Sequence, residues 1–253
     1  MTNSGSLKIP TLLSVETSTA AGSVAVLFSP DQADEKVLAQ NEWLRSRSHA
    51  EVATPAIEDA VHVAGGWSKI DALAVGVGPG SFTGIRVGLN AVRAIAWSTG
   101  RAVITVRSTD ALIEGARSSG LSPWENTIVA VLNAQMGLNF AAWASGAGEI
   151  TSPEAMDTKT LEKKLKALKQ PITLIGDAAD AVALELQALG RDVFRPRAPH
   201  LDFPHALTVA RLAGRVLRVS SALSDPQALV RLFDWRAAQP LYIRGSGAEE
   251  KMG

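Results

Sequence analysis

A glycine-rich loop between an apolar run and a predicted helix is the segment best suited to bind a ligand. It reads GPGSFTG over residues 78–84 and leads into a helix predicted over residues 85–99. Free backbone N–H groups and the helix dipole at a helix start favour an anion, so the loop could cradle a phosphate. Alternatively, the glycines only allow a tight turn and close packing of helix on strand. The lysine and the glycine spacing of a P-loop or a dinucleotide fingerprint are missing. The candidate phosphate residues of the loop are Gly78, Gly80, Ser81, Thr83 and Gly84.

Carboxylates near strand ends are the second group of chemical candidates. Glu16 ends the first predicted strand and is followed by Thr17 and Ser18. A carboxylate beside hydroxyls at such a junction could hold a magnesium ion and a γ-phosphate. It is equally consistent that Thr17 and Ser18 only satisfy the backbone of the turn. Asp177 could bind a ribose or a metal, but we favour a cap on the helix that follows it.

The four histidines are not spaced for a metal site. His49 is predicted to start a helix, and a helical metal pair would need a second histidine one turn later, where Ala53 stands. His62 is too far along that helix, and His200 and His205 lie far away in the sequence. The chain contains no cysteine, which excludes disulfides, thiolate zinc sites and a cysteine nucleophile. We therefore predict no metal site and no catalytic residue, and we assign His49 to the helix start or to an interface.

The composition is that of a compact globular protein. Of 253 residues, 46% are hydrophobic and 20% are charged, and 25 basic residues balance 25 acidic ones. Because nucleic-acid binders usually carry a basic excess, this chain is not expected to supply most of the contacts to an RNA. No window reaches the roughly 18 to 20 apolar residues of a membrane helix, and the N-terminus lacks a basic region followed by an apolar run. We expect a soluble, cytoplasmic protein without membrane contact.

The predicted elements of the first part of the chain are three strands followed by alternating helices and strands. Apolar periodicity and turn residues predict strands near 12–15, 23–28 and 37–43, a helix over 48–64, a strand over 70–77, the helix over 85–99, a strand over 101–106 and a helix over 108–117. Ser108 is expected to cap the last of these helices. Residues 118–126 have the composition of a linker, so we place a boundary there. The predicted lobes are residues 1–118 and 119–253.

The second part repeats this order more weakly, which indicates a duplicated α/β lobe. The expected elements are strands over 127–132 and 138–143 joined by a hairpin, a helix over 158–168, a strand over 172–175, helices over 178–189 and 205–219, and a final strand over 240–244. The last helix and strand could pack back on the first lobe.

Several motifs together resemble the bacterial TsaB (YeaZ) family. They are VETSTAAGSVAVL, His49 with the helix after it, LAVGVGPGSFTGIRVGLNAVRAIAW and STDAL. The similarity is continuous over about the first 115 residues. The second half is similar more loosely, since the family's Asp-Ala-Arg-Met-like turn reads Asn-Ala-Gln-Met-Gly at residues 133–137. The closing residues 240–244 again resemble the family's ending.

The resemblance implies an α/β fold with two lobes of the actin-like ATPase and sugar-kinase (RNase H-like) class, with mixed sheets flanked by helices. It also implies a non-catalytic subunit that pairs with TsaD, a homologue that holds a metal through paired histidines. TsaD transfers a threonylcarbamoyl group from threonylcarbamoyl adenylate to the adenosine next to the anticodon of tRNAs reading ANN codons. The ATPase TsaE is expected to bind the pair, and tRNA is reached only through the complex. No cofactor is expected in this chain, although ATP or ADP could lie at the interface with TsaD, and the chain could form a homodimer when alone.

In this family the two subunits pack helices of their first lobes together, which here implies the helices over 48–64 and 85–99. The interface candidates are His49, Val52, Ala56, Ile57, Leu89 and Val92. Two other functions stay open. The chain could be an independent ATPase or small-molecule kinase that uses Glu16, Ser18 and the glycine-rich loop. It could also be a glycoprotease-like peptidase, against which the missing histidine pair argues.

Overall fold

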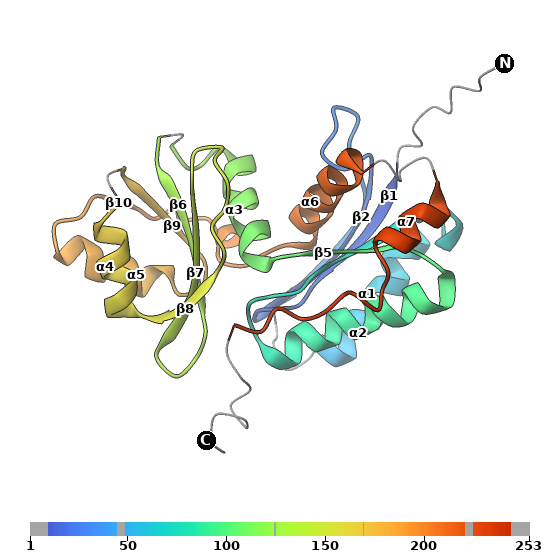
Figure 1. Ribbon diagram of the computed structural model, residues 1–253, viewed down its shortest axis with the longest axis horizontal. Coiled ribbons are helices and arrows are strands. Elements are labelled where there is room, and N and C mark those ends of the chain that lie inside the picture. The colour runs from blue at the N-terminus through green and yellow to red at the C-terminus, as the bar shows by residue number, and fades with distance from the viewer. Residues whose placement is uncertain (1–9, 45–48, 124, 169, 221–224, 244–253) are drawn as a thin grey trace.

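The chain folds into two five-stranded sheets that lie side by side, each covered by helices (Figure 1). The computed structural model describes residues 10–44, 49–123, 125–168, 170–220 and 225–243. No helix in these ranges is both long and apolar enough to cross a membrane. The predicted class, two mixed sheets flanked by helices, is confirmed.

The first sheet has the strand order β3-β2-β1-β4-β5. Its strands are β1 (Thr11–Glu16), β2 (Ala21–Phe28), β3 (Lys36–Leu44), β4 (Ala72–Gly76) and β5 (Val103–Val106). β1, β2 and β3 are antiparallel neighbours, whereas β4 and β5 run parallel to β1. β1 and β4 are buried along their whole length, and β4 has an unbroken apolar sequence, as is typical of a strand covered on both faces. β3 lies at the edge and alternates between exposed and covered residues.

The second sheet has the strand order β10-β9-β6-β7-β8 and repeats the pairing of the first. Its strands are β6 (Thr127–Asn133), β7 (Leu138–Ser145), β8 (Glu154–Asp157), β9 (Ile172–Ile175) and β10 (Val193–Phe194). β6, β7 and β8 form the antiparallel part, and β9 and β10 run parallel to β6. The predicted duplication of an α/β lobe is therefore visible in the topology, with β6, β7 and β8 in the places of β1, β2 and β3.

Two helices that pack against each other cover one face of the first sheet. α1 (His49–Val63) and α2 (Phe82–Thr99) pack on the side chains of Leu13 and Val15, whereas α6 (Ala206–Val219) packs on Leu12 from the opposite face. Successive residues of a strand point to opposite faces, so the helices on both faces of the sheet pack on side chains of the same strand, β1. The second sheet is covered in the same manner by α4 (Thr158–Lys166) and α5 (Ala179–Ala188) on one face and α3 (Ser108–Ser119) on the other.

Helices α3 and α6 are exchanged between the two halves. α3 follows the first sheet in sequence but packs on the second, and α6 follows the second sheet but packs on the first. Figure 1 shows α3 beside the second sheet and α6 beside the first. The division of the chain at residue 118 stays a prediction.

Several predicted boundaries differ from the structure. Residues 240–243 form no strand, because Leu241 makes only one backbone bond to the sheet region, to the Val77 carbonyl at 2.8 Å, and Arg244 lies outside the described residues. The prediction missed β8, β10 and helix α7 (Pro226–Leu232). β10 and α7 are too short for a clear apolar period, and β8 (EAMD) has no continuous apolar run. Short 3-10 turns at Trp67–Lys69 and Pro199–Leu201 were also not predicted. Ser48, the predicted first residue of α1, lies outside the described residues.

Candidate functional site: the cleft between the two halves

The glycines of the loop before α2 allow this helix to approach the turn after β1. A Cβ atom added to Gly80 would lie 2.1 Å from the Ser18 carbonyl oxygen, and one added to Gly84 would lie 2.2 Å from that of Thr17. Two hydrogen bonds join the same segments. The Ser81 amide donates to the Ser18 carbonyl at 2.6 Å, and the Thr17 hydroxyl donates to the Gly84 carbonyl at 2.8 Å. The close packing of α2 on the turn after β1 therefore explains why glycines stand at positions 80 and 84, without a bound ligand.

Helix α2 begins three residues earlier than the apolar pattern predicts. Its N-cap is Ser81, whose hydroxyl accepts a hydrogen bond of 3.2 Å from the Gly84 amide. Thr83 and Gly84 thus belong to the first turn of the helix and not to the loop. The start of α2, with the amide dipoles of its first turn, lies at the cleft.

The Glu16 carboxylate points into the protein and not into the cleft. The residue is 0% exposed, one carboxylate oxygen accepts from the Ser18 amide at 2.6 Å, and the other accepts from the Ser108 hydroxyl at 2.8 Å. Gly76 leaves the space for it, since a Cβ there would lie 1.8 Å from a Glu16 oxygen. Burial raises the pKa of Glu16, although hydrogen bonds from Ser18 and Ser108 act in the opposite direction. The structure therefore contradicts the magnesium interpretation of Glu16.

Ser108 connects these elements and does not cap α3. The N-cap residue is Arg107, and Ser108 is the first residue inside the helix. Its hydroxyl donates to Glu16 and accepts from the Gly78 amide at 3.1 Å. The predicted cap was wrong because the hydroxyl has partners on other elements. Gly78 itself has a φ of +98°, a conformation that favours glycine.

His49 is a buried link between α1 and the first sheet. Its Nδ1 accepts from the Trp43 indole at 2.8 Å, and its Nε2 lies 2.8 Å from the Thr19 carbonyl oxygen. Since an indole only donates and a carbonyl only accepts, these partners assign the proton to Nε2. Both ring nitrogens are engaged within the chain. In the described ranges, no three His, Cys, Asp or Glu side chains are grouped so that they could hold a metal ion.

A cleft of about 740 Å³ separates the two halves on the side of α2. The first half lines it with Ser18, Thr19, Ser81 and Thr83, among others, and the second half with Asn133, Gln135, Met136 and Asp177. Of the described residues that line it, none is a lysine or an arginine. Glu16 and Gly78 are not among them, so the cleft brings together only some of the predicted phosphate residues.

On the second half, the β6–β7 turn forms one wall of the cleft. The Asp177 carboxylate accepts from the Asn133 amide at 2.8 Å, and the Asn133 side chain accepts from the Gln135 amide at 2.7 Å. Desolvation raises the pKa of Asp177 above its ordinary value, against the hydrogen bond from Asn133. The favoured cap role of Asp177 was wrong, because the N-cap of α5 is Ala178 and the carboxylate is used to hold the turn.

An aromatic stack at the mouth of the cleft was missed by the sequence analysis. The rings of Phe82 and Tyr242 stack with centroids 4.8 Å apart. The Arg86 guanidinium lies 3.7 Å from the Phe82 centroid, and its Nε donates to the Tyr242 hydroxyl at 2.8 Å. This contact attaches the C-terminal segment to α2, along which it runs in Figure 1. The arginine one turn after Phe82 was the available signal, but its partner is 156 residues away.

Most of the predicted interface residues lie inside the core of the first half. Ala56 is 8% exposed, Ile57 1%, Leu89 2% and Val92 0%, and His49 is buried as well. The prediction was wrong for these residues because apolar periodicity marks the face of a helix that packs on its own sheet. Val52 is half-buried. The exposed outer faces carry Glu51, Pro55 and Glu58 on α1 and Asn90, Ala94 and Trp97 on α2.

The cleft fits a nucleotide triphosphate poorly. Hydroxyl groups and the start of α2 offer hydrogen bonds to single oxygens, but a bound polyphosphate also needs cations, from lysine, arginine or a carboxylate-held metal. The described lining supplies no lysine or arginine, and its carboxylate, Asp177, is already bonded to Asn133. Glu16 is turned away. The residues present therefore do not form a magnesium–ATP site within this chain.

A family model described as "TsaD: tRNA N6-adenosine threonylcarbamoyltransferase" matches residues 41–251. The chain belongs to this family. The resemblance to TsaB (YeaZ) is also confirmed, since the "tRNA threonylcarbamoyladenosine biosynthesis protein TsaB" of Haemophilus influenzae is 37% identical over 127 residues. That match covers 50% of this chain and 50% of the relative.

A relative called "tRNA N6-adenosine threonylcarbamoyltransferase" from Streptococcus pneumoniae strain R6 is 34% identical over 133 residues. This match covers 48% of the chain and 39% of the relative, so the chain spans half or less of the length of these curated members of the family.

Solved structures share the fold. "YeaZ from Pseudomonas aeruginosa" superposes with a TM-score of 0.65 at 21% identity, over 92% of this chain and 100% of that one. A second Pseudomonas aeruginosa protein, described as similar to peptidase YEAZ, gives 0.69 at 23% identity, over 93% and 100%. An activator of 2-hydroxyisocaproyl-CoA dehydratase from Clostridium difficile, with bound ADPNP, gives 0.50 at 9% identity, over 81% and 95%. These similarities show the predicted fold of two lobes with mixed sheets flanked by helices.

Proposed function

We propose that this chain is the non-catalytic partner of a TsaD-type subunit in the synthesis of threonylcarbamoyladenosine in tRNA. The TsaD-type subunit would transfer the threonylcarbamoyl group to the adenosine next to the anticodon in tRNAs reading ANN codons. This chain would supply a folded surface that binds and activates it. We place this work in the cytoplasm, where tRNA is used.

The observation that carries this proposal is the position of Glu16. Its carboxylate is fully buried and bonded to Ser18 and Ser108, so it cannot serve a metal or a phosphate in the cleft. His49, at the start of α1, has both nitrogens engaged by Trp43 and Thr19. The Glu16 carboxylate and the His49 imidazole, which stand where phosphate or metal binding would be expected, thus hold the first half together through hydrogen bonds. This arrangement favours a non-catalytic partner subunit over an enzyme.

The same observations argue against the alternative of an independent ATPase or kinase. That function would need Glu16 and Ser18 to face a metal-bound phosphate, and it would need positive charge in the cleft. A glycoprotease-like peptidase would need a metal or a nucleophile with its base, and Ser81 has its hydroxyl in the N-cap bond to Gly84. ATP or ADP at the interface with the TsaD-type subunit remains compatible with the proposal, because the partner would then supply the charged groups.

A reconstitution separates these functions. The chain, the TsaD-type subunit and TsaE of the same organism are mixed with threonylcarbamoyl adenylate and an unmodified tRNA, and the modified adenosine is quantified after digestion. We expect product only when the chain and the TsaD-type subunit are both present. Product at full yield without the chain, or magnesium-dependent ATP turnover by the chain alone, would overturn the proposal.

We place the partner surface on the outer faces of α1 and α2, which their own sheet does not cover. Ala94 is exposed on α2, so Ala94→Asp should abolish co-purification with the TsaD-type subunit while the unfolding temperature stays unchanged. Leu184→Asp, at another exposed position, on α5, is the control and should leave binding intact. Leu89→Asp is unsuitable, because this buried side chain supports the core. Unchanged binding by Ala94→Asp would move the interface elsewhere.

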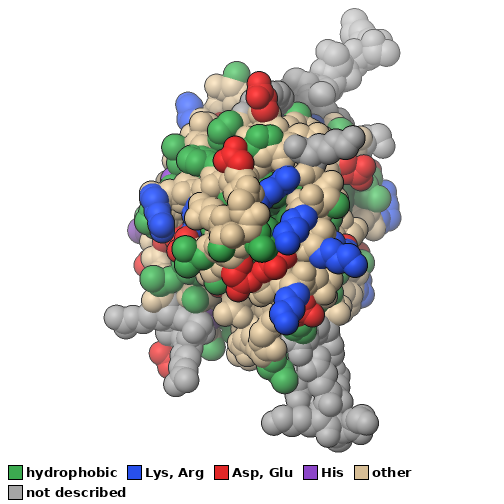
Figure 2. Space-filling model, turned by 90° about the vertical axis from the view of Figure 1, so that its left-hand side faces the viewer, with side chains coloured by type: hydrophobic (Ala, Val, Ile, Leu, Met, Phe, Trp, Pro, Cys, Tyr) green, Lys and Arg blue, Asp and Glu red, His purple; other side chains and the backbone are tan. Residues whose placement is uncertain are grey.

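Three further partner assignments complete the proposal. In the absence of the TsaD-type subunit, the faces of α1 and α2 would be free to form a homodimer, which light scattering after gel filtration would detect. TsaE would bind the assembled pair. Contact with tRNA would occur only through the complex, since the end of the second half carries basic and acidic side chains next to each other (Figure 2), as in the Lys164–Glu154 pair at 2.7 Å. Filter binding of tRNA by the chain alone should therefore be weak.

A further inference from the structure

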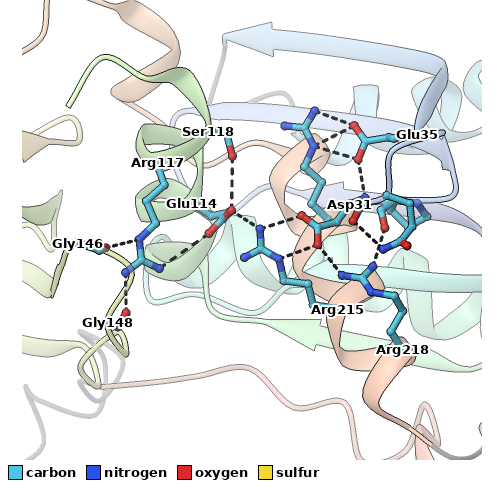
Figure 3. Close-up of polar contacts among 12 residues, drawn as sticks. Asp31, Glu35, Glu114, Arg117, Ser118, Gly146, Gly148, Arg215 and Arg218 are labelled. Carbon is cyan, nitrogen blue, oxygen red and sulfur yellow. Dashed lines mark hydrogen bonds and ion pairs between the residues drawn. The ribbon is translucent and has the colours of Figure 1, made fainter. Parts of the chain in front are cut away.

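Helices α3 and α6 meet where the two halves touch. Each covers the sheet of the opposite half, so a bond between them joins the first sheet to the second. Their contact is not purely apolar. Glu114 on α3 and Arg215 on α6 form an ion pair whose carboxylate is only 5% exposed. This pair is the centre of a longer series of polar contacts (Figure 3).

On the side of the second sheet, the series continues through Arg117. Its guanidinium lies 3.9 Å from the other Glu114 oxygen and donates to the carbonyl oxygens of Gly146, at 3.0 Å, and Gly148, at 2.6 Å. These two glycines belong to the connection between β7 and β8. Arg117 therefore attaches α3 to the outer connection of the second sheet.

On the side of the first sheet, the series continues through Asp31. Its two carboxylate oxygens accept from the Arg215 guanidinium at 2.8 and 2.9 Å. Asp31 lies in the connection between β2 and β3 and has a φ of +62°, unusual for a residue other than glycine. Arg218 also donates to Asp31 and to the Pro30 carbonyl. The connection is thus held in one conformation by α6.

The two connections joined in this way are equivalent in the repeated fold. β7 and β8 occupy in the second sheet the places of β2 and β3 in the first. The contacts run from one connection to the other through Arg117, Glu114, Arg215 and Asp31, without a gap. Because Glu114 is shielded from water, its attraction to the two arginines is screened less by salt than at an open surface.

We infer that this series of four residues is an inter-lobe brace, which holds the two sheets at one angle and so keeps the cleft on the other side of the molecule at a fixed width. Enzymes with two lobes around a cleft commonly close by hinge motion. A partner subunit that only presents a surface gains from rigidity, since a preformed interface loses less freedom on binding. The brace rests on the geometry of this chain and does not depend on the proposed function.

A neighbouring ion pair provides the matched control. Arg211, one turn before Arg215 on α6, binds Glu35 through several hydrogen bonds, the shortest 2.7 Å. Glu35 lies in the same β2–β3 connection as Asp31. The Arg211–Glu35 pair therefore joins α6 only to the first sheet, which α6 already covers. Arg211→Gln removes an ion pair of the same helix without cutting the path between the sheets.

The test measures the distance between the two halves. Since the chain has no cysteine, Lys69→Cys and Leu184→Cys place single spin labels on exposed positions of the first and second halves. In Glu114→Gln, we expect an electron–electron distance distribution about two-fold broader than in the parent. We also expect amide exchange about ten-fold faster in the β7–β8 connection. Arg211→Gln should leave the width unchanged.

Equal widths in the parent and Glu114→Gln, with a lower unfolding temperature for the variant, would overturn the brace and leave only a stabilising contact. If Glu114→Gln does not fold, Arg117→Gln tests the same path at a half-covered position and should broaden the distribution as well. A folded Arg117→Gln with the width of the parent would also overturn it. Broadening of the same size by Arg211→Gln would overturn the brace too, because the effect would then follow from any loss of charge on α6 and not from this path.

Discussion

The hydroxyl of Ser108 donates a hydrogen bond of 2.8 Å to the fully buried carboxylate of Glu16. The two residues are 92 positions apart and join the end of β1 to the beginning of α3. The same hydroxyl accepts from the Gly78 amide at 3.1 Å, so three segments around the cleft are tied at one point. The group that most resembled a metal ligand in the sequence is thus part of the internal support of the cleft.

Glu16→Gln should stabilise the protein at alkaline pH. Burial raises the pKa of Glu16, so the folded state binds the proton more tightly than the unfolded state. The contribution of this group to stability is then present below the ordinary glutamate pKa and is lost as the pH rises through the raised value. Each unit of increase corresponds to about 1.4 kcal/mol of unfolding free energy. The neutral amide can still accept from Ser18 and donate to Ser108.

Urea unfolding at pH 5 and pH 8 checks this prediction. The difference in unfolding free energy between Glu16→Gln and the parent should be more favourable to the variant at pH 8 than at pH 5. Glu58→Gln, at an exposed position of α1, should show no such trend. A difference that does not change with pH would mean that Glu16 carries its charge in the folded protein without cost.

Alanine at Gly84 should destabilise the protein, whereas alanine at Gly115 should not. A Cβ at Gly84 would lie 2.2 Å from the Thr17 carbonyl oxygen, so α2 would have to move, at a cost of about 1–3 kcal/mol. At Gly115 in α3 the nearest atom to a new Cβ is 3.7 Å away. There the helix propensity of alanine should add about 0.5–1 kcal/mol. Equal effects of the two substitutions in urea unfolding would contradict the close-packing role of Gly84.

Much of the fold could be predicted from local patterns. The unbroken apolar sequence of β4 indicated a buried strand, and the repeat of strand and helix order indicated the duplication. β10 has only two residues, and β8, with the sequence EAMD, lacks the mainly apolar sequence that marked β9, a strand of the same length. The start of α2 was placed late because Phe82 and Thr83 precede the apolar period and are helical through the Ser81 cap.

The candidate site was harder to predict, since it depends on contacts between distant residues. The sequence places Glu16 at a strand end but gives no sign that Ser108 turns its carboxylate inward. Apolar periodicity correctly identified α1 and α2. The interface that the resemblance implied was placed on their apolar residues Leu89 and Val92, which face the core. The brace between Glu114 and Arg215 joins residues 101 positions apart, and no local pattern marks it.

Replacement of His49 by leucine should cost the protein about 2–4 kcal/mol of unfolding free energy. The change leaves the Trp43 indole N–H and the Thr19 carbonyl, which His49 now bonds at 2.8 Å each, without these partners. A buried polar group without a hydrogen-bond partner lowers the unfolding free energy by its full desolvation penalty. His62→Leu, at an exposed position of the same helix, is the control and should change stability by less than about 0.5 kcal/mol. A loss of similar size in both variants would place the effect in helix α1 generally.

Tyr242→Ala should release the C-terminal segment from α2 more than it lowers overall stability. The ring stacks on Phe82, and such aromatic pairs contribute about 0.5–1.5 kcal/mol beyond their buried area. Tyr242→Phe keeps the stack and removes only the hydroxyl that accepts from Arg86, so its effect should be smaller. Hydrogen exchange of residues 235–243 should accelerate strongly in Tyr242→Ala and slightly in Tyr242→Phe, while exchange in β4 stays slow in both. If the alanine variant protects this segment as well as the parent does, the backbone bond from Leu241 to Val77 and the packing of Trp235 suffice to hold it, and the stack at the cleft mouth has another role.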